Sequence, residues 1–438
     1  MTEITNLHIR NFKGVSELDY SPKRLNLITG RNNTGKTSLL ESINIIFNPK
    51  YIDNFSKNLD KVVHTNGKSA TISAEYTRQQ QTLDSNFTSQ SPEVQHREIG
   101  FREPREQESV DIFINTLQDI LETNEDYPIR IRHNESFEEE GFKEDMKDAL
   151  TETITEMPED ISISGTRSNS IVLEIDGELY SYIHLGEYYE EIREHIISES
   201  KEKLQEKNSK ESFDFEDPRE RERLQHAIMR GLHNQLVPRF GSDRFVGNRP
   251  DPVEGVRLVK SPLLKAEDVD MSQENAAVKA SDIEDYLIEN NILENLEDFS
   301  FEKLVFRDDS EKYEIPYSFM GDGFRTIVGI LWEVLSAERE GNVLLLEEPD
   351  VHMHPGYIES LLTQLVKVVR EKNLQLFITT HNIDMIEGFF SDNLKSKEEV
   401  FLSDHFQLLQ LTDPIPRTLD YRSAEEEIED LNVDLRGI

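Results

Sequence analysis

Eight consecutive residues near the N-terminus carry a pattern with a defined chemistry. They read G-R-N-N-T-G-K-T and fit G-x-x-x-x-G-K-[ST] in full. The glycines allow a tight turn that gathers backbone N–H groups around phosphates, and the lysine and the last threonine suit phosphate oxygens and Mg²⁺. We expect a nucleoside triphosphate such as ATP to bind here with Mg²⁺; a chance match in a strand, turn and helix is the alternative. The residues expected to contact the nucleotide are Gly30, Arg31, Asn32, Asn33, Thr34, Gly35, Lys36, Thr37 and Ser38.

An acidic pair follows an apolar run in the C-terminal third of the chain. The run from Val343 to Leu346 is entirely apolar, and Glu347 and Glu348 come directly after it. Ligands of open α/β sheets bind at the carboxyl ends of the strands. We therefore expect Glu347 to bind Mg²⁺ together with Thr37, and Glu348 to activate the attacking water. Solvated acids at a strand end are the alternative, and the phosphate loop favours the catalytic interpretation.

Three further groups stand at the ends of predicted elements. His381 ends an apolar run and is expected beside the γ-phosphate, although a single histidine is more often structural. Gly321 and Gly323 precede an amphipathic helix and predict a second anion site, with an ordinary N-cap turn as the alternative. His352 and His354 have the spacing of a zinc pair, but no further ligand set accompanies them, so we favour no zinc site.

Strands alternate with helices in two blocks, and these elements must position the residues above. Leu25 to Ile28 predicts a strand before the phosphate loop, and Lys36 to Phe47 has helical spacing after it. In the second block we expect strands over 343–346, 376–378 and 407–411, and helices over 324–335 and 357–370. This alternation predicts an α/β fold whose mixed, mostly parallel sheet is assembled from both ends of the chain.

A different region separates the two blocks. The chain turns polar from about Gln79 to Ser109, and a hairpin is expected over Ile171 to Tyr180, where Asp-Gly suits a type I′ turn. We predict three parts: the N-terminal part of the nucleotide-binding domain over 1–105, an inserted α+β or helical lobe over 106–300, and the C-terminal part of the same domain over 301–438. The lobe carries none of the motifs, so we expect it to select the partner.

The amino-acid composition indicates the environment in which the protein is expected to function. Acidic residues outnumber Lys and Arg by 87 to 48, and the formal net charge is −39. Because the excess is spread along the chain, it indicates a surface adapted to high salt, and it disfavours nonspecific nucleic-acid binding by bulk charge. The chain has no cysteine, and no apolar stretch approaches the ~18 residues of a membrane span. We expect a halophilic, cytoplasmic protein without disulfides or membrane contact.

The order of the motifs resembles the ABC-class ATPases of the RecF, OLD and SMC-like group, often described as AAA family ATPases. Leu7 to Lys13 resembles their opening strand, Gly30 to Thr37 their Walker A loop, Gly321 to Gly323 their signature motif, Glu347 to Asp350 with His354 and Pro355 their Walker B region, and Thr379 to His381 their switch histidine. The final Asp434 to Gly437 looks like the end of a compact archaeal and bacterial subgroup without a Toprim nuclease domain.

Three positions depart from the pattern of that group. Glu347 stands where the family usually has aspartate, which implies a longer reach to the metal. Gly321 replaces the usual signature serine and removes a side-chain contact to the γ-phosphate. The Q-loop glutamine is one of Gln79, Gln80 and Gln81, and the sequence leaves the choice open.

The resemblance implies an ATPase that works as a pair. In the family, two heads enclose two nucleotides, and each Walker A loop faces the partner's signature motif. Carried over, ATP closes a homodimer in which Gly321 and Gly323 act in trans, and hydrolysis through Glu348 opens it. Such a switch would act on nucleic acid or on an effector protein, in DNA metabolism or anti-phage defence.

Other functions stay open. The second hypothesis is an ATPase subunit that regulates a separately encoded nuclease or toxin. A nuclease within this chain is disfavoured, because the segment after His381 is too short for a Toprim domain with its metal-binding carboxylates. A GTPase switch is disfavoured because no Asn-Lys-x-Asp motif occurs, and Glu348 disfavours a scaffold that never hydrolyses its nucleotide.

Overall fold

The computed structural model describes residues 2–65, 67–78, 93–123, 148–156, 169–184, 192–203, 243–260, 262–272, 275–308, 311–340, 343–351, 353–372, 374–412, 415–429 and 433–436. The chain divides into two compact units. The first comprises Met1–Pro49, Thr71–Glu98 and Asp251–Ile438, and the second comprises Lys50–Ala70 and Ile99–Pro250. The three-part domain division stays a prediction. The compact units divide the chain elsewhere, because residues 251–300 belong to the unit that holds the phosphate loop.

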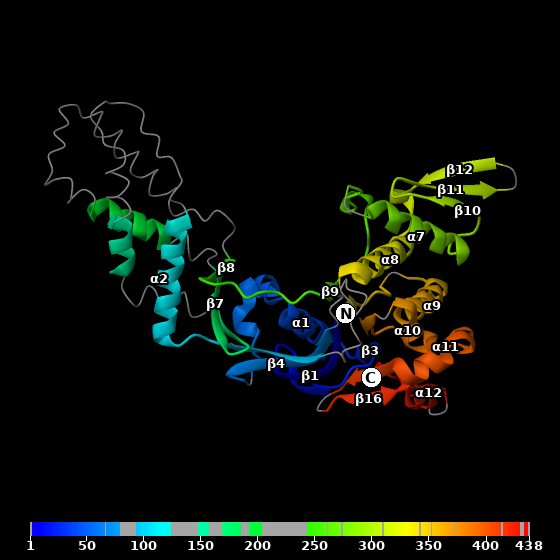
Figure 1. Cartoon of the computed structure of the whole chain (residues 1–438), viewed down its shortest axis with the longest axis horizontal. Helices are drawn as coiled ribbons and strands as arrows, with labels where there is room; N and C mark the ends of the chain where they lie inside the picture. Colours follow the sequence, from blue (N-terminus) through cyan, green and yellow to red (C-terminus); the bar gives the residue numbers. More distant parts are fainter. Residues whose placement is uncertain are drawn as a thin grey trace, which may run out of the picture. The chain divides into compact units, whose positions relative to one another are not determined.

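A six-stranded sheet forms the core of the first unit (Figure 1). Its strands are β3 (Leu25–Gly30), β9 (Val256–Val259), β13 (Val343–Glu347), β14 (Gln375–Thr379), β15 (Phe406–Leu411) and β16 (Arg417–Asp420). The order is β16-β15-β3-β14-β13-β9, and every neighbouring pair is parallel except β15 with β16. The predicted mixed sheet assembled from both chain ends is therefore confirmed, and the edge strand β9 is an addition from the region assigned to the inserted lobe.

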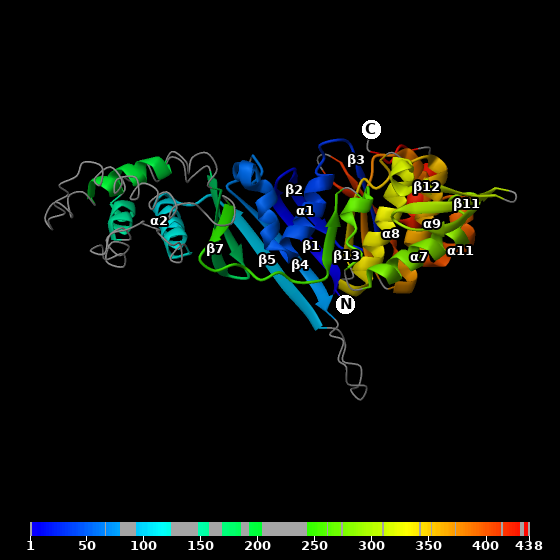
Figure 2. The same cartoon turned by 90° about the horizontal axis from the view of Figure 1, so that it is seen from above.

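Helices cover both faces of this sheet, as Figure 2 shows for α1 on one side and α8, α9 and α11 on the other. The helices are α1 (Lys36–Phe47), α8 (Asp322–Glu340), α9 (Pro355–Lys372), α10 (Ile383–Gly388), α11 (Asp392–His405) and α12 (Tyr421–Glu429). Leu344, Leu346 and Leu376 pack in one apolar cluster with residues of α8 to α12. Leu345 and Phe377 face the opposite side of the sheet, because successive residues of a strand point to opposite faces. They are also fully buried, so both faces of the sheet are covered. Burial on both faces explains why these strands are continuously apolar.

Antiparallel strands lie before and after the phosphate loop in the sequence. Strand β1 (Thr2–Phe12) pairs with β2 (Val15–Tyr20) on one side and with β4 (Ser69–Arg78) on the other. The buried side chain of Gln375 ties β1 to the core sheet, because its Oε1 accepts from the N–H of Ile4 at 2.8 Å and its Nε2 donates to the Ile4 carbonyl at 2.9 Å. The start of β1 is thereby bound to β14 of the core sheet.

A small antiparallel sheet packs on the second face of α8. It comprises β10 (Leu296–Phe299), β11 (Lys303–Asp308) and β12 (Glu311–Pro316), and α7 (Ala276–Glu289) joins its apolar cluster. Phe324, Val328 and Trp332 of α8 belong to this cluster, whereas Ile330 and Val334 belong to the core-sheet cluster. Helix α8 is therefore buried on two faces, which explains its near-continuous apolar character.

The second unit contains the helix α2 (Glu106–Thr123), two further helical segments over 148–155 and 192–203, and the strands β6 (Ser170–Ile175), β7 (Glu178–His184) and β8 (Asp243–Val246). Asp176 and Gly177 join β6 to β7 with φ values of 51° and 89°. Positive φ at both positions is what a type I′ turn requires, so the predicted hairpin is confirmed. None of the helices within the described ranges combines the length and the apolar character that a bilayer span needs.

Candidate nucleotide-binding and hydrolysis site

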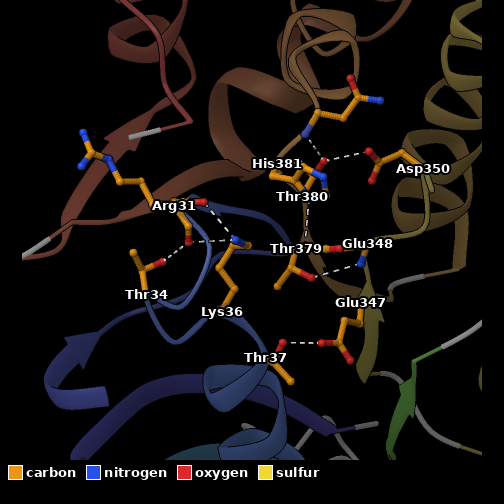
Figure 3. A network of polar contacts seen from close by, with 12 residues as sticks. Arg31, Thr34, Lys36, Thr37, Glu347, Glu348, Asp350, Thr379, Thr380 and His381 are labelled. Atoms are coloured by element: carbon orange, nitrogen blue, oxygen red, sulfur yellow. Dashed lines mark hydrogen bonds and ion pairs between the residues drawn. The ribbon is translucent and has the colours of Figure 1, made fainter. Parts of the chain in front are cut away.

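The strand register brings the predicted motifs to one edge of the core sheet. Thr379 at the end of β14 is opposite Ile28 of β3 and Glu347 of β13. The phosphate loop, the acidic pair and His381 therefore leave three adjacent parallel strands at their carboxyl ends, where open α/β sheets bind ligands. Figure 3 shows the side chains from these three segments gathered around Lys36.

The phosphate loop needs glycine at both ends. Gly30 has a φ of 148°, and a Cβ there would lie 2.6 Å from Thr34 Oγ1 and 2.7 Å from the carbonyl oxygen of Leu411. Gly35 has a φ of 96°, and a Cβ there would lie 3.0 Å from the carbonyl oxygen of Gly14. Both backbone conformations are ones that residues with side chains rarely adopt. Of the four residues between them, Arg31, Asn32 and Asn33 are exposed.

The side chain of Lys36 folds back into the loop. Only 6 % of the residue is exposed, and its Nζ donates to the carbonyl oxygens of Gly30 at 2.9 Å and Arg31 at 3.1 Å. Burial lowers the pKa of this ammonium group, and the negative charges of Glu348 and Glu347 act in the opposite direction. The lysine thus lies in the loop as a compact positive charge whose hydrogen bonds can exchange to an anion.

Thr37 and Glu347 face each other across the site, and the Thr37 hydroxyl donates to Glu347 Oε1. A hydroxyl and a carboxylate are hard oxygen ligands, and Mg²⁺ is usually held by one or two carboxylates together with substrate phosphates. These two residues therefore fit Mg²⁺. No group of three or more His, Cys, Asp or Glu side chains placed to hold a metal occurs within the described ranges. His352 of the considered zinc pair lies outside those ranges.

Glu348 and His381 form a second pair. Glu348 has a φ of 44°, in the left-handed region, and its N–H donates to the carbonyl of Thr379 at 3.0 Å and to Thr379 Oγ1 at 3.1 Å. Its Oε1 lies 3.0 Å from Nδ1 of His381. A left-handed backbone at a residue with a side chain costs roughly 1–2 kcal/mol. Glu348 is therefore held in a conformation that sequence propensity alone would not select.

The glycine turn before α8 stands apart from the phosphate loop. Helix α8 begins at Asp322, so Gly323 lies in its first turn. The guanidinium of Arg325 donates a hydrogen bond to Asp322 Oδ1 at 2.5 Å. Across the described residues, no hydrogen bond or ion pair joins this turn to the phosphate loop. Gln79, Gln80 and Gln81, the candidates for the Q-loop residue, lie outside the described residues.

The turn between β1 and β2 supports the loop in a way that the motifs did not reveal. The N–H of Gly14 donates to Ser38 Oγ at 3.3 Å, so this predicted nucleotide contact also serves the turn. Lys13 and Lys260 both form ion pairs with Glu41, a helix α1 residue that is only 3 % exposed. These lysines lie far apart in the sequence, and only the fold brings them to one carboxylate.

The C-terminal segment also supports the loop. The carbonyl oxygen of Leu435 accepts from Thr29 Oγ1 at 2.7 Å and from Gln410 Nε2 at 3.1 Å. Thr29 directly precedes Gly30, and its side chain is fully buried. The only signal in the sequence was the resemblance of Asp434 to Gly437 to the end of a subgroup, which gave no role for the segment. The structure shows that its residues support the strand leading into the phosphate loop.

Replacing Thr29 by valine is expected to lower the free energy of unfolding by about 1–2 kcal/mol, because the Leu435 carbonyl loses one of two buried donors. Urea unfolding in molar KCl, followed by circular dichroism, measures the change. Thr29→Ser keeps the hydroxyl and serves as the control. A valine variant as stable as the wild type would contradict the assignment of this contact.

Comparisons with known proteins agree with these motifs. A family model described as AAA ATPase domain matches residues 3–386. The Uncharacterized protein MJECL11 of Methanocaldococcus jannaschii is 28 % identical over 120 residues, which cover 27 % of this chain and 100 % of that protein.

Solved structures of Smc head domains were also matched. The Smc head domain of Pyrococcus furiosus, with an extended coiled coil and bound to the C-terminal domain of ScpA, has a TM-score of 0.40 at 11 % identity, over 99 % of this chain and 100 % of that chain. The SMC head domain of Thermotoga maritima has a TM-score of 0.38 at 10 % identity, over 95 % of this chain and 98 % of that chain. The family assignment depends on the family model, which runs from the first strand into α10. The chain belongs to the AAA ATPase domain family.

Proposed function

We propose that this chain binds ATP with Mg²⁺, hydrolyses it, and uses the nucleotide to control the pairing of two copies. The observation that carries the proposal is the meeting of Lys36, Thr37, Glu347, Glu348 and His381 at the carboxyl ends of β3, β13 and β14. A phosphate-binding lysine, two oxygen ligands and an acid paired with a histidine are the groups that phosphoryl transfer to water uses. Membership of the ATPase family supports ATP as the nucleotide.

Binding would begin at the loop. Its backbone N–H groups and the N-terminus of α1 would hold the phosphates. Lys36 would exchange its bonds to the Gly30 and Arg31 carbonyls for bonds to β- and γ-phosphate oxygens. Thr37 and Glu347 would hold Mg²⁺, directly or through water. When bound, Mg²⁺ would neutralise part of the phosphate charge.

Hydrolysis would use the second pair. Glu348 accepts a proton from the water whose oxygen attacks the γ-phosphorus, and the bond to the β–γ bridging oxygen breaks, leaving ADP and phosphate. His381 orients this carboxylate through Nδ1, which lies 3.0 Å from Glu348 Oε1, and its Nε2 is the nitrogen left to contact a γ-phosphate oxygen. Both side chains are partly exposed, His381 by 49 % and Glu348 by 32 %, so substrate and water can reach them.

The proposed pairing accounts for the separate glycine turn. Gly321 and Gly323 make no polar contact with the phosphate loop of their own chain within the described residues. A second copy would supply the turn in trans and complete the site. Phe319, two residues before Gly321, is 80 % exposed, which supports burial of this surface against a partner.

The partner beyond the second copy is proposed to be nucleic acid or a separately encoded effector such as a nuclease or a toxin. The second unit holds none of the candidate site residues, so it is free to select that partner. The charge of −39 supports work in the cytoplasm of a halophile. Molar KCl is therefore the proper assay condition.

Phosphate release and mass by light scattering, measured in molar KCl, test the proposal. We expect release that requires Mg²⁺, and a doubling of the 50.9 kDa mass when ATP and Mg²⁺ are added. Absence of phosphate release would refute hydrolysis. An unchanged mass with ATP bound would refute the pairing and leave hydrolysis standing.

A further inference from the structure

The side chain of Thr380 joins three segments of the site. Thr380 follows β14 and directly precedes His381, and it is fully buried. Its N–H donates to the carbonyl of Ile28 at 3.0 Å, so it is bound to β3 just before the phosphate loop. Its Oγ1 accepts from the N–H of Asn382 at 3.0 Å. Thr380 therefore fixes the backbone before His381 through Ile28 and the backbone after it through Asn382.

The hydroxyl of Thr380 also forms a hydrogen bond with Asp350, as Figure 3 shows. Thr380 Oγ1 donates to Asp350 Oδ2 at 3.0 Å. Asp350 lies in the turn that begins at Glu348, since the N–H of Val351 donates to the Glu348 carbonyl at 3.2 Å. One hydrogen bond thus links the turn that carries Glu348 to the turn that carries His381.

Burying the second carboxylate oxygen of Asp350, Oδ1, is energetically unfavourable. The residue is only 4 % exposed, and its Oδ1 has no hydrogen-bond partner within the described ranges. Burial raises the pKa of this carboxyl group, while its own N–H, the side chains of Thr380 and Asn382, and His381 act in the opposite direction. An apolar side chain of the same size would avoid the desolvation cost. Packing alone therefore does not explain a carboxylate here, whereas its bond to Thr380 does.

Thr379 provides a parallel link between the same two turns. The N–H of Glu348 donates to both the carbonyl and the hydroxyl of Thr379. The two adjacent threonines thus fix the backbones of Glu348 and His381 relative to each other. The side chains of that pair are partly exposed and gain little positioning from packing. Their 3.0 Å separation must therefore come largely from the backbone.

We propose that Thr380, held by Asp350, is a positioning residue that sets His381 against Glu348 for ATP hydrolysis. The inference rests on the proposed function. Misplacement of a catalytic group by about 1 Å can lower a rate by ~100-fold. Thr380 is bound to Ile28 of β3, the strand that leads into the phosphate loop, through its backbone N–H, and a side-chain substitution leaves that bond in place.

The test is Thr380→Val in the full-length chain. Valine keeps the size and removes the hydroxyl. We expect kcat to fall by about 10- to 100-fold, while the Kd of a non-hydrolysable ATP analogue changes by less than about threefold. Thr380→Ser keeps the hydroxyl and should restore kcat to within about threefold of the wild type. Asp350→Leu removes the acceptor and should reproduce the loss, whereas Asp350→Asn keeps an acceptor oxygen and should not.

A double-mutant cycle separates positioning from general disruption. In a His381→Ala background, Thr380→Val should lower kcat no further, because the residue through which it acts is absent. A further loss there, or an unchanged kcat in the single variant, would overturn the inference. If Thr380→Val does not fold, the two Asp350 variants decide by the same criteria. A wild type without phosphate release would overturn the proposed function as well, whereas an active wild type with an unaffected Thr380→Val would overturn only the inference.

Discussion

Glu348→Gln is expected to abolish ATP turnover and to leave ATP binding intact. Glutamine keeps the length of the side chain and its oxygen beside His381, but it cannot accept the proton of the attacking water. Loss of a positioned general base lowers a rate by about 100- to 10,000-fold. The N–H of residue 348 still donates to Thr379, so the turn is expected to keep its conformation. Phosphate release in molar KCl and the Kd of ATP are the two measurements.

The same variant should accumulate the ATP-bound pair. Since hydrolysis is proposed to open the dimer, a variant that binds without hydrolysing stays closed, and light scattering with ATP and Mg²⁺ should give twice the 50.9 kDa mass. Glu302→Gln is the matched control, because Glu302 is exposed and lies outside the site. Turnover at the wild-type rate in Glu348→Gln would exclude the assigned role.

Lys36→Met is expected to remove nucleotide binding itself. Methionine fills a similar volume without the ammonium group, so the phosphates lose their buried positive charge. Truncating one partner of a buried, hydrogen-bonded charge pair costs about 2–5 kcal/mol, which corresponds to roughly a 30- to 5,000-fold rise in Kd. Phosphate binding should strengthen the charged form, because it adds negative charge beside a lysine whose pKa burial lowers. Titration with a fluorescent ATP analogue measures the effect.

A second lysine provides the control for that experiment. Lys303 is exposed on β11 and forms an ion pair with Glu314 at 2.6 Å, so Lys303→Met removes the same charge outside the site. Its Kd for ATP should match that of the wild type. Circular dichroism should show both variants folded. ATP binding of wild-type strength by Lys36→Met would disprove the phosphate-binding role of the loop, whatever the turnover.

Lys36→Met and Glu348→Gln act on different steps, so together they test nucleotide binding and hydrolysis separately. Lys36→Met should prevent both turnover and pairing, since neither proceeds without bound nucleotide. Glu348→Gln should prevent turnover and preserve pairing. A chain in which nucleotide controls assembly without hydrolysis would show the first result and no measurable turnover in the wild type. The pair of variants therefore distinguishes an ATPase switch from a scaffold.

Local motifs predicted much of the site because their chemistry depends on neighbours in the sequence. The glycines of the phosphate loop stand five residues apart along the chain, and their positive φ values follow from the turn that their own segment makes. The strands β3, β13 and β14 were predictable for a similar reason, since burial on both faces leaves a continuous apolar run. The short edge strand β9 was not predicted, because only Val259 of its residues is buried.

Contacts between distant segments were beyond prediction. Thr29 and Leu435 are separated by 406 positions, and Lys260 reaches Glu41 across 219. The left-handed backbone of Glu348 is likewise decided by the bonds that its N–H makes to Thr379 of another strand. A glutamate in an acidic chain carries no local sign of such a conformation.

The phosphate loop, the acidic strand end, the histidine after β14 and an α/β fold assembled from both chain ends could all be predicted from the amino-acid sequence, because each depends on residue type and short spacing. Which of these residues lie next to one another could be seen only in the folded chain. The tertiary structure aligned the strand ends through their register, paired Glu348 with His381, placed Asp350 against Thr380, and, within the described residues, left the turn at Gly321 without a hydrogen bond or ion pair to the loop of its own chain. Parallel strands far apart in the sequence can pair in several registers, and the packing of both sheet faces selects one.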